Sequence, residues 1–149
     1  MKLAVIALIP EMLTAVRNYG VIGRAFERGL AELTVINPRD FTFDRHSTVD
    51  DRPYGGGPGM VLKAEPVIAA VDHAKEQVGE GAVVIHCSPR GVPLSQAHLS
   101  RWIADGKPLI FLASRYEGVD QRAIDLRDDG ARCADQIVAR GARGRKFQK

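Results

Sequence analysis

The sequence predicts an α/β domain with a mainly parallel sheet and helices on both faces, and three observations support this fold class. The chain has 149 residues, the size of one domain. Apolar runs alternate along it with segments whose apolar residues recur at helical spacing. The runs are apolar throughout, which is typical of parallel strands that are covered on both faces. We therefore expect four or five parallel strands joined by helical crossovers.

Four of the apolar runs are predicted strands. The first is followed by Pro10 and the second by Asn37-Pro38, and a proline cannot donate a hydrogen bond to a sheet. The third is followed at once by a Ser-Pro-Arg-Gly turn sequence, and the fourth by a polar segment. The four predicted strands are Leu3–Ile9, Leu33–Ile36, Val83–His86 and Leu109–Ala113.

Helices are predicted where a start signal precedes periodic apolar residues. Pro10 suits the first turn of a helix that carries Met12 and Val16, and we expect Gly20 and Gly23 to break it. The hydroxyl of Ser95 can cap a later helix. The other predicted helices are Arg24–Arg28, Glu65–Gln77, a helix from Ser95 through Ile103, and one that starts at Gln121–Leu126. Trp102 falls at a core position of the third of these.

Composition argues against several classes of protein. No apolar run approaches the roughly 20 residues that a membrane helix needs. The N-terminus lacks the long apolar segment of a secretory signal, so we expect a cytoplasmic protein with no membrane partner. Cys87 and Cys133 are far apart, and the four histidines show no ligand spacing. We therefore expect no metal site.

The positive charge belongs to the end of the chain. The whole sequence holds 21 basic and 18 acidic residues, and residues 127–149 account for seven of the basic and three of the acidic ones. Residues 1–126 therefore carry 14 basic and 15 acidic groups. We interpret residues 1–126 as the folded domain and residues 127–149 as a divergent basic tail, for which disorder is the simpler explanation.

Three polar loops can form a ligand site, because ligands bind beyond the carboxyl ends of parallel strands. They are residues 39–60, 88–94 and 114–120. The run Gly55–Gly59 fits neither of the common phosphate-binding glycine motifs, so it is either a flexible hinge or a loop shaped for close approach. Ser88–Gly91 is also a common turn sequence.

The segment Asp44–Arg52 is dense in charge. A solvated surface loop is the simpler explanation. The functional alternative is an RNA-binding patch in which Arg45 and Arg52 contact phosphate and Asp50 or Asp51 orients the partner.

Residues 43–60, Phe-Asp-Arg-His-Ser-Thr-Val-Asp-Asp-Arg-Pro-Tyr-Gly-Gly-Gly-Pro-Gly-Met, closely resemble the signature loop of the bacterial tRNA (guanine-N1)-methyltransferases. The resemblance covers about residues 1–126. Further matching motifs are Pro10-Glu-Met12, Tyr19-Gly-Val21, Gly23-Arg-Ala25, Asn37-Pro-Arg-Asp-Phe41, Ser88-Pro89-x-Gly91 and Arg115-Tyr-Glu-Gly-Val-Asp120.

The resemblance implies a SPOUT trefoil-knot fold, a homodimer, S-adenosyl-L-methionine as cofactor, and a transferase that methylates the guanosine 3′ of the tRNA anticodon. It implies that three loops hold the cofactor and that Glu117 lies near the target base as a supporting catalytic residue. The implied cofactor-binding residues are Ser88, Pro89, Gly91, Ser114, Tyr116, Glu117, Gly118, Ile137 and Val138.

The third of these loops departs from the family pattern, because Arg132–Ala142 keeps only an echo of it. The family usually has Gly where this chain has Ser114. The family's catalytic Asp and Arg and its tRNA-binding C-terminal domain would follow Lys149. We therefore expect the isolated chain to methylate tRNA at no useful rate. The alternative is a non-catalytic remnant that acts at most as a dimerising or RNA-contacting module.

Overall fold

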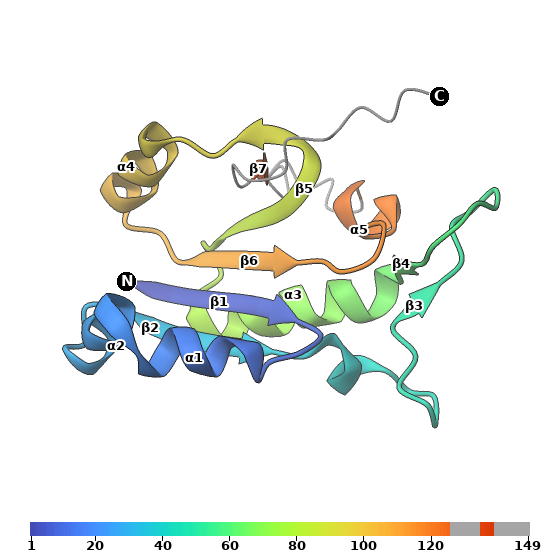
Figure 1. Ribbon diagram of the computed structural model, residues 1–149, viewed down its shortest axis with the longest axis horizontal. Helices are drawn as coiled ribbons and strands as arrows, with labels where there is room; N and C mark the ends of the chain where they lie inside the picture. The colour runs from blue at the N-terminus through green and yellow to red at the C-terminus, as the bar shows by residue number, and fades with distance from the viewer. Residues whose placement is uncertain (126–134, 139–149) are drawn as a thin grey trace.

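The computed structural model describes residues 1–125 and 135–138, in which a five-stranded sheet forms the centre of the molecule (Figure 1). Its strand order is β2-β1-β6-β5-β7, and each neighbouring pair is parallel. The fold class predicted from the sequence is confirmed. The strands are β1 Lys2–Ala7, β2 Glu32–Ile36, β5 Val83–Pro93, β6 Leu109–Ala113 and β7 Asp135–Val138.

One face of the sheet packs on the longest helix, α3. Ala4 and Ile6 of β1 and Ile110 of β6 are fully buried in a core that also contains Val67 and Ala70 of this helix. Val67 and Ala70 recur at helical spacing, so the buried face of α3 forms one apolar stripe that faces the strands. The helices are α1 Met12–Asn18, α2 Gly20–Glu27, α3 Ala64–Val78, α4 Gln96–Asp105 and α5 Gln121–Asp125, with a short 3-10 helix at Pro38–Phe41.

The other face of the sheet packs on α4. Trp102 of α4 is buried against Ile85 and Leu109, and its ring meets Phe111 edge to face. Successive residues of a strand point to opposite faces, so Leu109 and Ile110 enter different cores. Helices therefore cover both faces, and the structural role predicted for Trp102 is confirmed.

The structure corrects the predicted role of Gly23. This glycine does not break a helix but lies inside α2. A Cβ at Gly23 would come within 2.9 Å of the backbone carbon of Asn18, at the junction of α1 and α2. Gly20, at φ +72°, begins α2 directly after the extended Tyr19. Gly23 is thus required for the close packing of the two helices.

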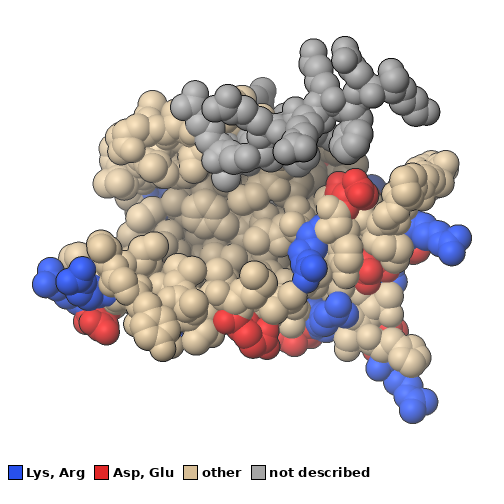
Figure 2. Space-filling model, in the orientation of Figure 1, with Lys and Arg blue, Asp and Glu red and all other residues tan. Residues whose placement is uncertain are grey.

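The face shown in Figure 2 has a broad area without charged side chains, and the Lys, Arg, Asp and Glu residues seen there lie mostly toward its ends and lower edge. Every residue of α1 is at least partly exposed, including Met12 and Val16. Tyr19, Val21 and Ile22, at the start of α2, are also exposed. Patches of this kind commonly mark protein–protein contacts. None of the described helices combines the length and hydrophobicity that spanning a membrane requires.

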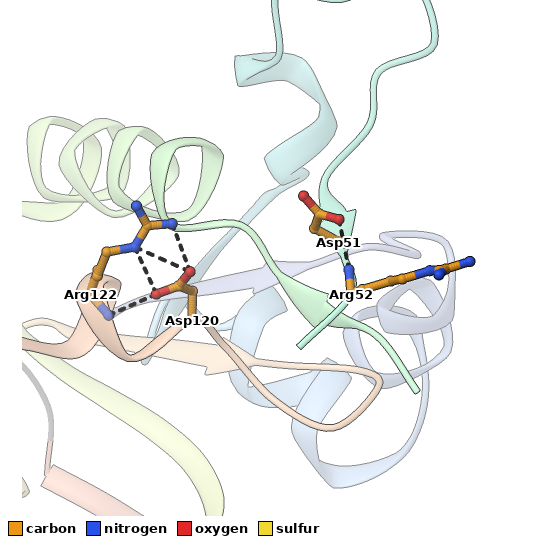
Figure 3. A network of polar contacts seen from close by, with 4 residues as sticks. All are labelled: Asp51, Arg52, Asp120 and Arg122. Atoms are coloured by element: carbon orange, nitrogen blue, oxygen red, sulfur yellow. Dashed lines mark hydrogen bonds and ion pairs between the residues drawn. The ribbon is translucent and has the colours of Figure 1, made fainter. Parts of the chain in front are cut away.

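Asp120 connects the end of the β6 loop to the start of α5 (Figure 3). Its carboxylate accepts a hydrogen bond from the backbone N–H of Arg122 at 2.9 Å, the position of an N-cap. The Arg122 guanidinium donates to the same carboxylate at 2.8 Å. These contacts to Arg122 hold the pKa of Asp120 below its ordinary value.

We expect Asp120→Ala to lower the free energy of unfolding at pH 7 by about 1 kcal/mol, because it removes the cap. The pKa of Asp120 is depressed in the folded protein, so its contribution is present above the ordinary aspartate value and is lost as the pH falls through the folded pKa. Urea denaturation should therefore show a difference between parent and variant that shrinks from pH 7 to pH 3.

Asp120→Asn is the matched control for this experiment. It keeps an oxygen that can accept from the Arg122 N–H and removes only the exposed ion pair, which solvent screens. It should lose less stability than Asp120→Ala. Equal losses in the two variants would contradict the capping role.

Candidate cofactor and RNA site

Parallel pairing brings the carboxyl ends of the central strands together. His86 of β5 is the register partner of Leu112, and Ala7 of β1 is that of Ala113. Ser114 directly follows β6, and its Oγ lies 3.4 Å from Nε2 of His86. The predicted cofactor-binding loops therefore begin side by side at one edge of the sheet, as an α/β ligand site requires.

The first predicted cofactor loop differs from its expected form. Residues 88–91 do not leave the sheet as a loop but lie within β5, which extends to Pro93. Ile137 of β7 pairs with both Cys87 and Val92, so the register shifts across residues 88–91. Such a bulge bends a strand and turns its backbone groups away from regular pairing. Pairing with β7 is what extends β5. β7 was not predicted from the sequence, because its apolar segment, Ile137–Val138, is short.

This pairing places two of the predicted loops together. Ile137 and Val138 lie in β7 directly beside the bulge that contains Ser88, Pro89 and Gly91. Ser88 is buried. The remainder of the predicted basic tail, residues 127–134 and 139–149, lies outside the described residues. The backbone of the third loop thus reaches the predicted cofactor edge, although its sequence departs from the family pattern.

The second cofactor loop, residues 114–118, has a constrained backbone. Tyr116 adopts φ +63°, which is uncommon for a residue with a side chain, and Gly118 adopts φ +128°, a conformation that favours glycine. Strain of this kind is concentrated at functional sites. The side chains of Tyr116 and Glu117 are exposed, where a ligand can reach them.

Backbone hydrogen bonds attach this loop to the glycine-rich loop. The N–H of Glu117 donates to the carbonyl of Met60 at 3.0 Å, and the N–H of Leu62 donates to the carbonyl of Gly118 at 3.0 Å. The N–H of Asp120 donates to the carbonyl of Leu62 at 2.8 Å. Leu62 is in turn part of β4, Val61–Leu62, which pairs antiparallel with β3, Asp50–Asp51. Two of the predicted site loops are therefore one hydrogen-bonded unit.

The side chain of Glu117 lies across the Cα atom of Gly59. A Cβ added at Gly59 would be 2.6 Å from Cγ of Glu117 and 3.0 Å from its Oε1. Carbon atoms that are not bonded do not approach this closely, so the glycine is required for the observed position of the carboxylate. The glycine run pointed to close approach, but the partner of Gly59 is visible only in the structure.

The turn that carries Arg45 is closed by Asp44. The Asp44 carboxylate accepts from the N–H of His46 and from both the N–H and Oγ of Thr48, the last at 2.7 Å. The hydrogen bond from the Thr48 hydroxyl is the largest influence that lowers the pKa of Asp44. Arg45 is exposed at the tip of this turn, so it can reach a partner.

Arg52 follows β3 and extends away from the Asp120–Arg122 pair (Figure 3). Its backbone N–H donates to the Asp51 carboxylate at 2.7 Å. Within the described residues, neither the Arg45 nor the Arg52 guanidinium is paired with a carboxylate. Asp50 is half-buried in β3, and its partner strand β4 lies between it and the loop that carries Glu117. The predicted RNA-binding residues therefore flank the site on one side.

Three backbone features lie together at the predicted cofactor edge. The bulge in β5, the strained 114–118 loop and β7 offer backbone donors and acceptors at one edge. No group of three potential metal-ligating side chains gathers among residues 1–125 and 135–138. Ser114, the position at which we expected crowding, directs its hydroxyl to His86. That contact was not predicted from the sequence.

Comparison with known proteins agrees with this geometry. Residues 1–143 match the sequence profile of the family described as tRNA (Guanine-1)-methyltransferase TrmD. Three relatives, each called tRNA (guanine-N(1)-)-methyltransferase, come from Pseudomonas fluorescens strain Pf-5, Escherichia coli O127:H6 and Shewanella denitrificans. They are 50%, 50% and 53% identical to this chain over 129 residues.

These alignments cover 87% of this chain and 51%, 50% and 52% of the three relatives. The chain thus spans about half the length of the curated relatives that it matches. The family profile covers nearly the whole chain, including β1 at one end of the sequence and β7 at the other. This protein belongs to the tRNA (guanine-1)-methyltransferase family.

Proposed function

We propose that this chain forms the cofactor-binding part of a tRNA (guanine-N1)-methyltransferase that uses S-adenosyl-L-methionine and modifies the guanosine 3′ of the anticodon. One observation carries the proposal. The predicted cofactor loops meet at the carboxyl edge of a parallel sheet, and backbone hydrogen bonds attach the glycine-rich loop of the family to the one that contains Glu117. The protein then acts in the cytoplasm, where tRNA is its substrate. In keeping with the SPOUT class, we propose that β7 closes a trefoil knot beside β5.

The chemistry requires alignment and control of one proton. When bound, S-adenosyl-L-methionine supplies an activated methyl group on a sulfonium. Guanine N1 carries a proton in its neutral form, so an acceptor near this atom raises its reactivity. Glu117 is an exposed carboxylate on a constrained loop, and we assign it to the N–H edge of the guanine. The backbone of residues 88–91 and 114–118 would hold the cofactor against it.

The exposed guanidinium groups suit the phosphates of an RNA. Arg45 and Arg52 are exposed and lie on either side of β3 in the sequence. β3 lies at one end of the molecule (Figure 1). Contacts to phosphate position an RNA without reading its sequence. Asp50 lies between the two arginines in sequence and on the strand that pairs with β4, and we assign it to orienting the substrate.

We also propose that the protein is a homodimer. The exposed apolar residues of α1 and of the start of α2 form a continuous stretch of chain, from Met12 to Ile22. A helix that buries none of its apolar side chains within its own subunit gains stability by burying them against a second copy. The family resemblance, which implies a homodimer, supports this assembly.

Binding of S-adenosyl-L-methionine tests the cofactor site. Gly118→Ala should raise the dissociation constant about ten- to hundredfold, because the loop at φ +128° would distort and lose one or two backbone hydrogen bonds. Gly106→Ala is the matched control, since it adds a methyl group at another left-handed glycine, remote from the site at the end of α4. Isothermal titration calorimetry measures both. Equal affinities in the two variants would count against the 114–118 loop as a cofactor site.

Methyl transfer tests the reaction. Glu117→Gln keeps the size of the side chain and removes its charge. We expect the parent chain, which spans about half the length of its relatives, to transfer methyl slowly, and Glu117→Gln to lower this rate further with little change in KM for tRNA. The measurement is transfer of labelled methyl from S-adenosyl-L-methionine to unmodified tRNA that carries guanosine after the anticodon. A protein that binds both substrates and transfers no methyl group would instead support the non-catalytic RNA-contacting alternative.

Sedimentation tests the dimer. Val21→Glu places a charge on the exposed apolar surface, and we expect it to shift the protein from dimer to monomer at tens of micromolar, because a carboxylate is costly to bury. Gln77→Glu adds the same charge to an exposed position of α3 and should leave the dimer intact. A parent protein that sediments as a monomer would contradict the proposed assembly.

A further inference from the structure

We propose that Gly59 is a positioning residue for the carboxylate of Glu117, so that the glycine-rich loop sets the direction in which this side chain meets the substrate. The inference rests on the proposed function in one respect: it takes Glu117 to act on the target base. The contact itself is a property of the fold. Gly59 carries no side chain, and its role is to leave room for the side chain of Glu117.

The contact is close along most of the Glu117 side chain. Measured from a Cβ placed on Gly59, Cγ of Glu117 lies at 2.6 Å, Oε1 at 3.0 Å and Cδ at 3.2 Å. The crowded atoms therefore include the middle of the side chain as well as one carboxylate oxygen. Rotation of the carboxylate alone cannot relieve the 2.6 Å contact, because that torsion leaves Cγ in place. The whole side chain must turn or the backbone must separate.

The backbone is held on both sides of this contact. The N–H of Glu117 donates to the carbonyl of Met60, which directly follows Gly59. The next bond of the same ladder joins the N–H of Leu62 to the carbonyl of Gly118. Leu62 is buried and fixes this ladder to the core. Separation of the two chains would break these hydrogen bonds, so we expect a side chain at position 59 to displace the Glu117 side chain.

Because Glu117 is exposed, we expect this displacement to change the stability of the fold little and to lower the rate of catalysis. The side chain is exposed and can turn into solvent without breaking a packed core. A displacement of about 1 Å at a reacting group can reduce a rate roughly a hundredfold. A methyl group at position 59 should therefore change the position of the carboxylate much more than it changes the stability of the fold.

The other glycines of the run provide a matched comparison. Gly55 has φ +87° and Gly59 has φ +90°, so alanine meets the same backbone strain at both positions. Within the described part of the chain, a Cβ added at Gly55 has no atom within 4 Å. The difference between Gly59→Ala and Gly55→Ala therefore isolates the contact with Glu117. Gly106→Ala, at φ +63° and remote from the site, gives the effect of left-handed strain on activity.

The experiment is a kinetic double-mutant cycle with a structural readout. We expect Gly59→Ala to lower the rate of methyl transfer about ten- to hundredfold relative to Gly106→Ala, with little change in KM for tRNA, and to lower Tm by about as much as Gly55→Ala does. Gly106→Ala should keep the parent kcat. In a Glu117→Ala background, Gly59→Ala should cause no further loss of kcat, because the side chain through which it acts is gone. By carbon-13 NMR, the Glu117 carboxyl resonance should shift in Gly59→Ala and stay in place in Gly106→Ala.

Two results would overturn the inference. One is an unmoved Glu117 carboxyl resonance in Gly59→Ala, and the other is a full additional loss of kcat when Gly59→Ala is combined with Glu117→Ala. A parent protein that does not bind S-adenosyl-L-methionine would instead contradict the proposed function. In that case the NMR comparison still decides whether Gly59 sets the position of the carboxylate.

Discussion

The parallel register of β6 with β1 and β5 is the constraint on which the rest of the structure depends. It aligns Ala113 with Ala7 and places His86 beside Leu112, so β1 and β6 end at the edge where the irregular part of β5 begins. Burial on both faces maintains this register, because a shift by one residue would exchange the apolar residues of the α3 and α4 cores. The loops that leave this edge lie close together because the strands that precede them are neighbours in the sheet.

A second, smaller ladder connects the site to the glycine-rich loop. The hydrogen bonds between residues 60–62 and residues 117–120 hold Glu117 and the segment from Asp50 to Gly59 in one unit. Asp120 caps the helix that follows this unit, and Asp44 closes the turn that precedes it, each through hydrogen bonds from nearby N–H groups. The charged and glycine-rich segment therefore has a defined conformation, and its arginine side chains are exposed. This arrangement favours its interpretation as a binding loop over that as a hinge.

Local sequence determined the elements whose signals are short-range. The apolar run Leu109–Ala113 is a strand with the predicted bounds, and α3 differs from its predicted limits by one residue at each end. Gly23 was misread because a glycine within a helix and a glycine that ends one look alike in sequence. The difference lies in the neighbouring backbone of Asn18, which only the packed structure provides. β5 was predicted too short for a similar reason, since its second half is paired by β7.

The sequence by itself determined the α/β class, the family and the loops that form the candidate site, because periodicity and motifs are properties of consecutive residues. Tertiary structure alone decided which of these residues meet. Gly59 and Glu117 are distant in the chain, as are Ser114 and His86, and no local pattern encodes either contact. Both contacts arise because parallel strands and long connections bring remote segments to one edge, where sterics and hydrogen bonding select the residues that fit.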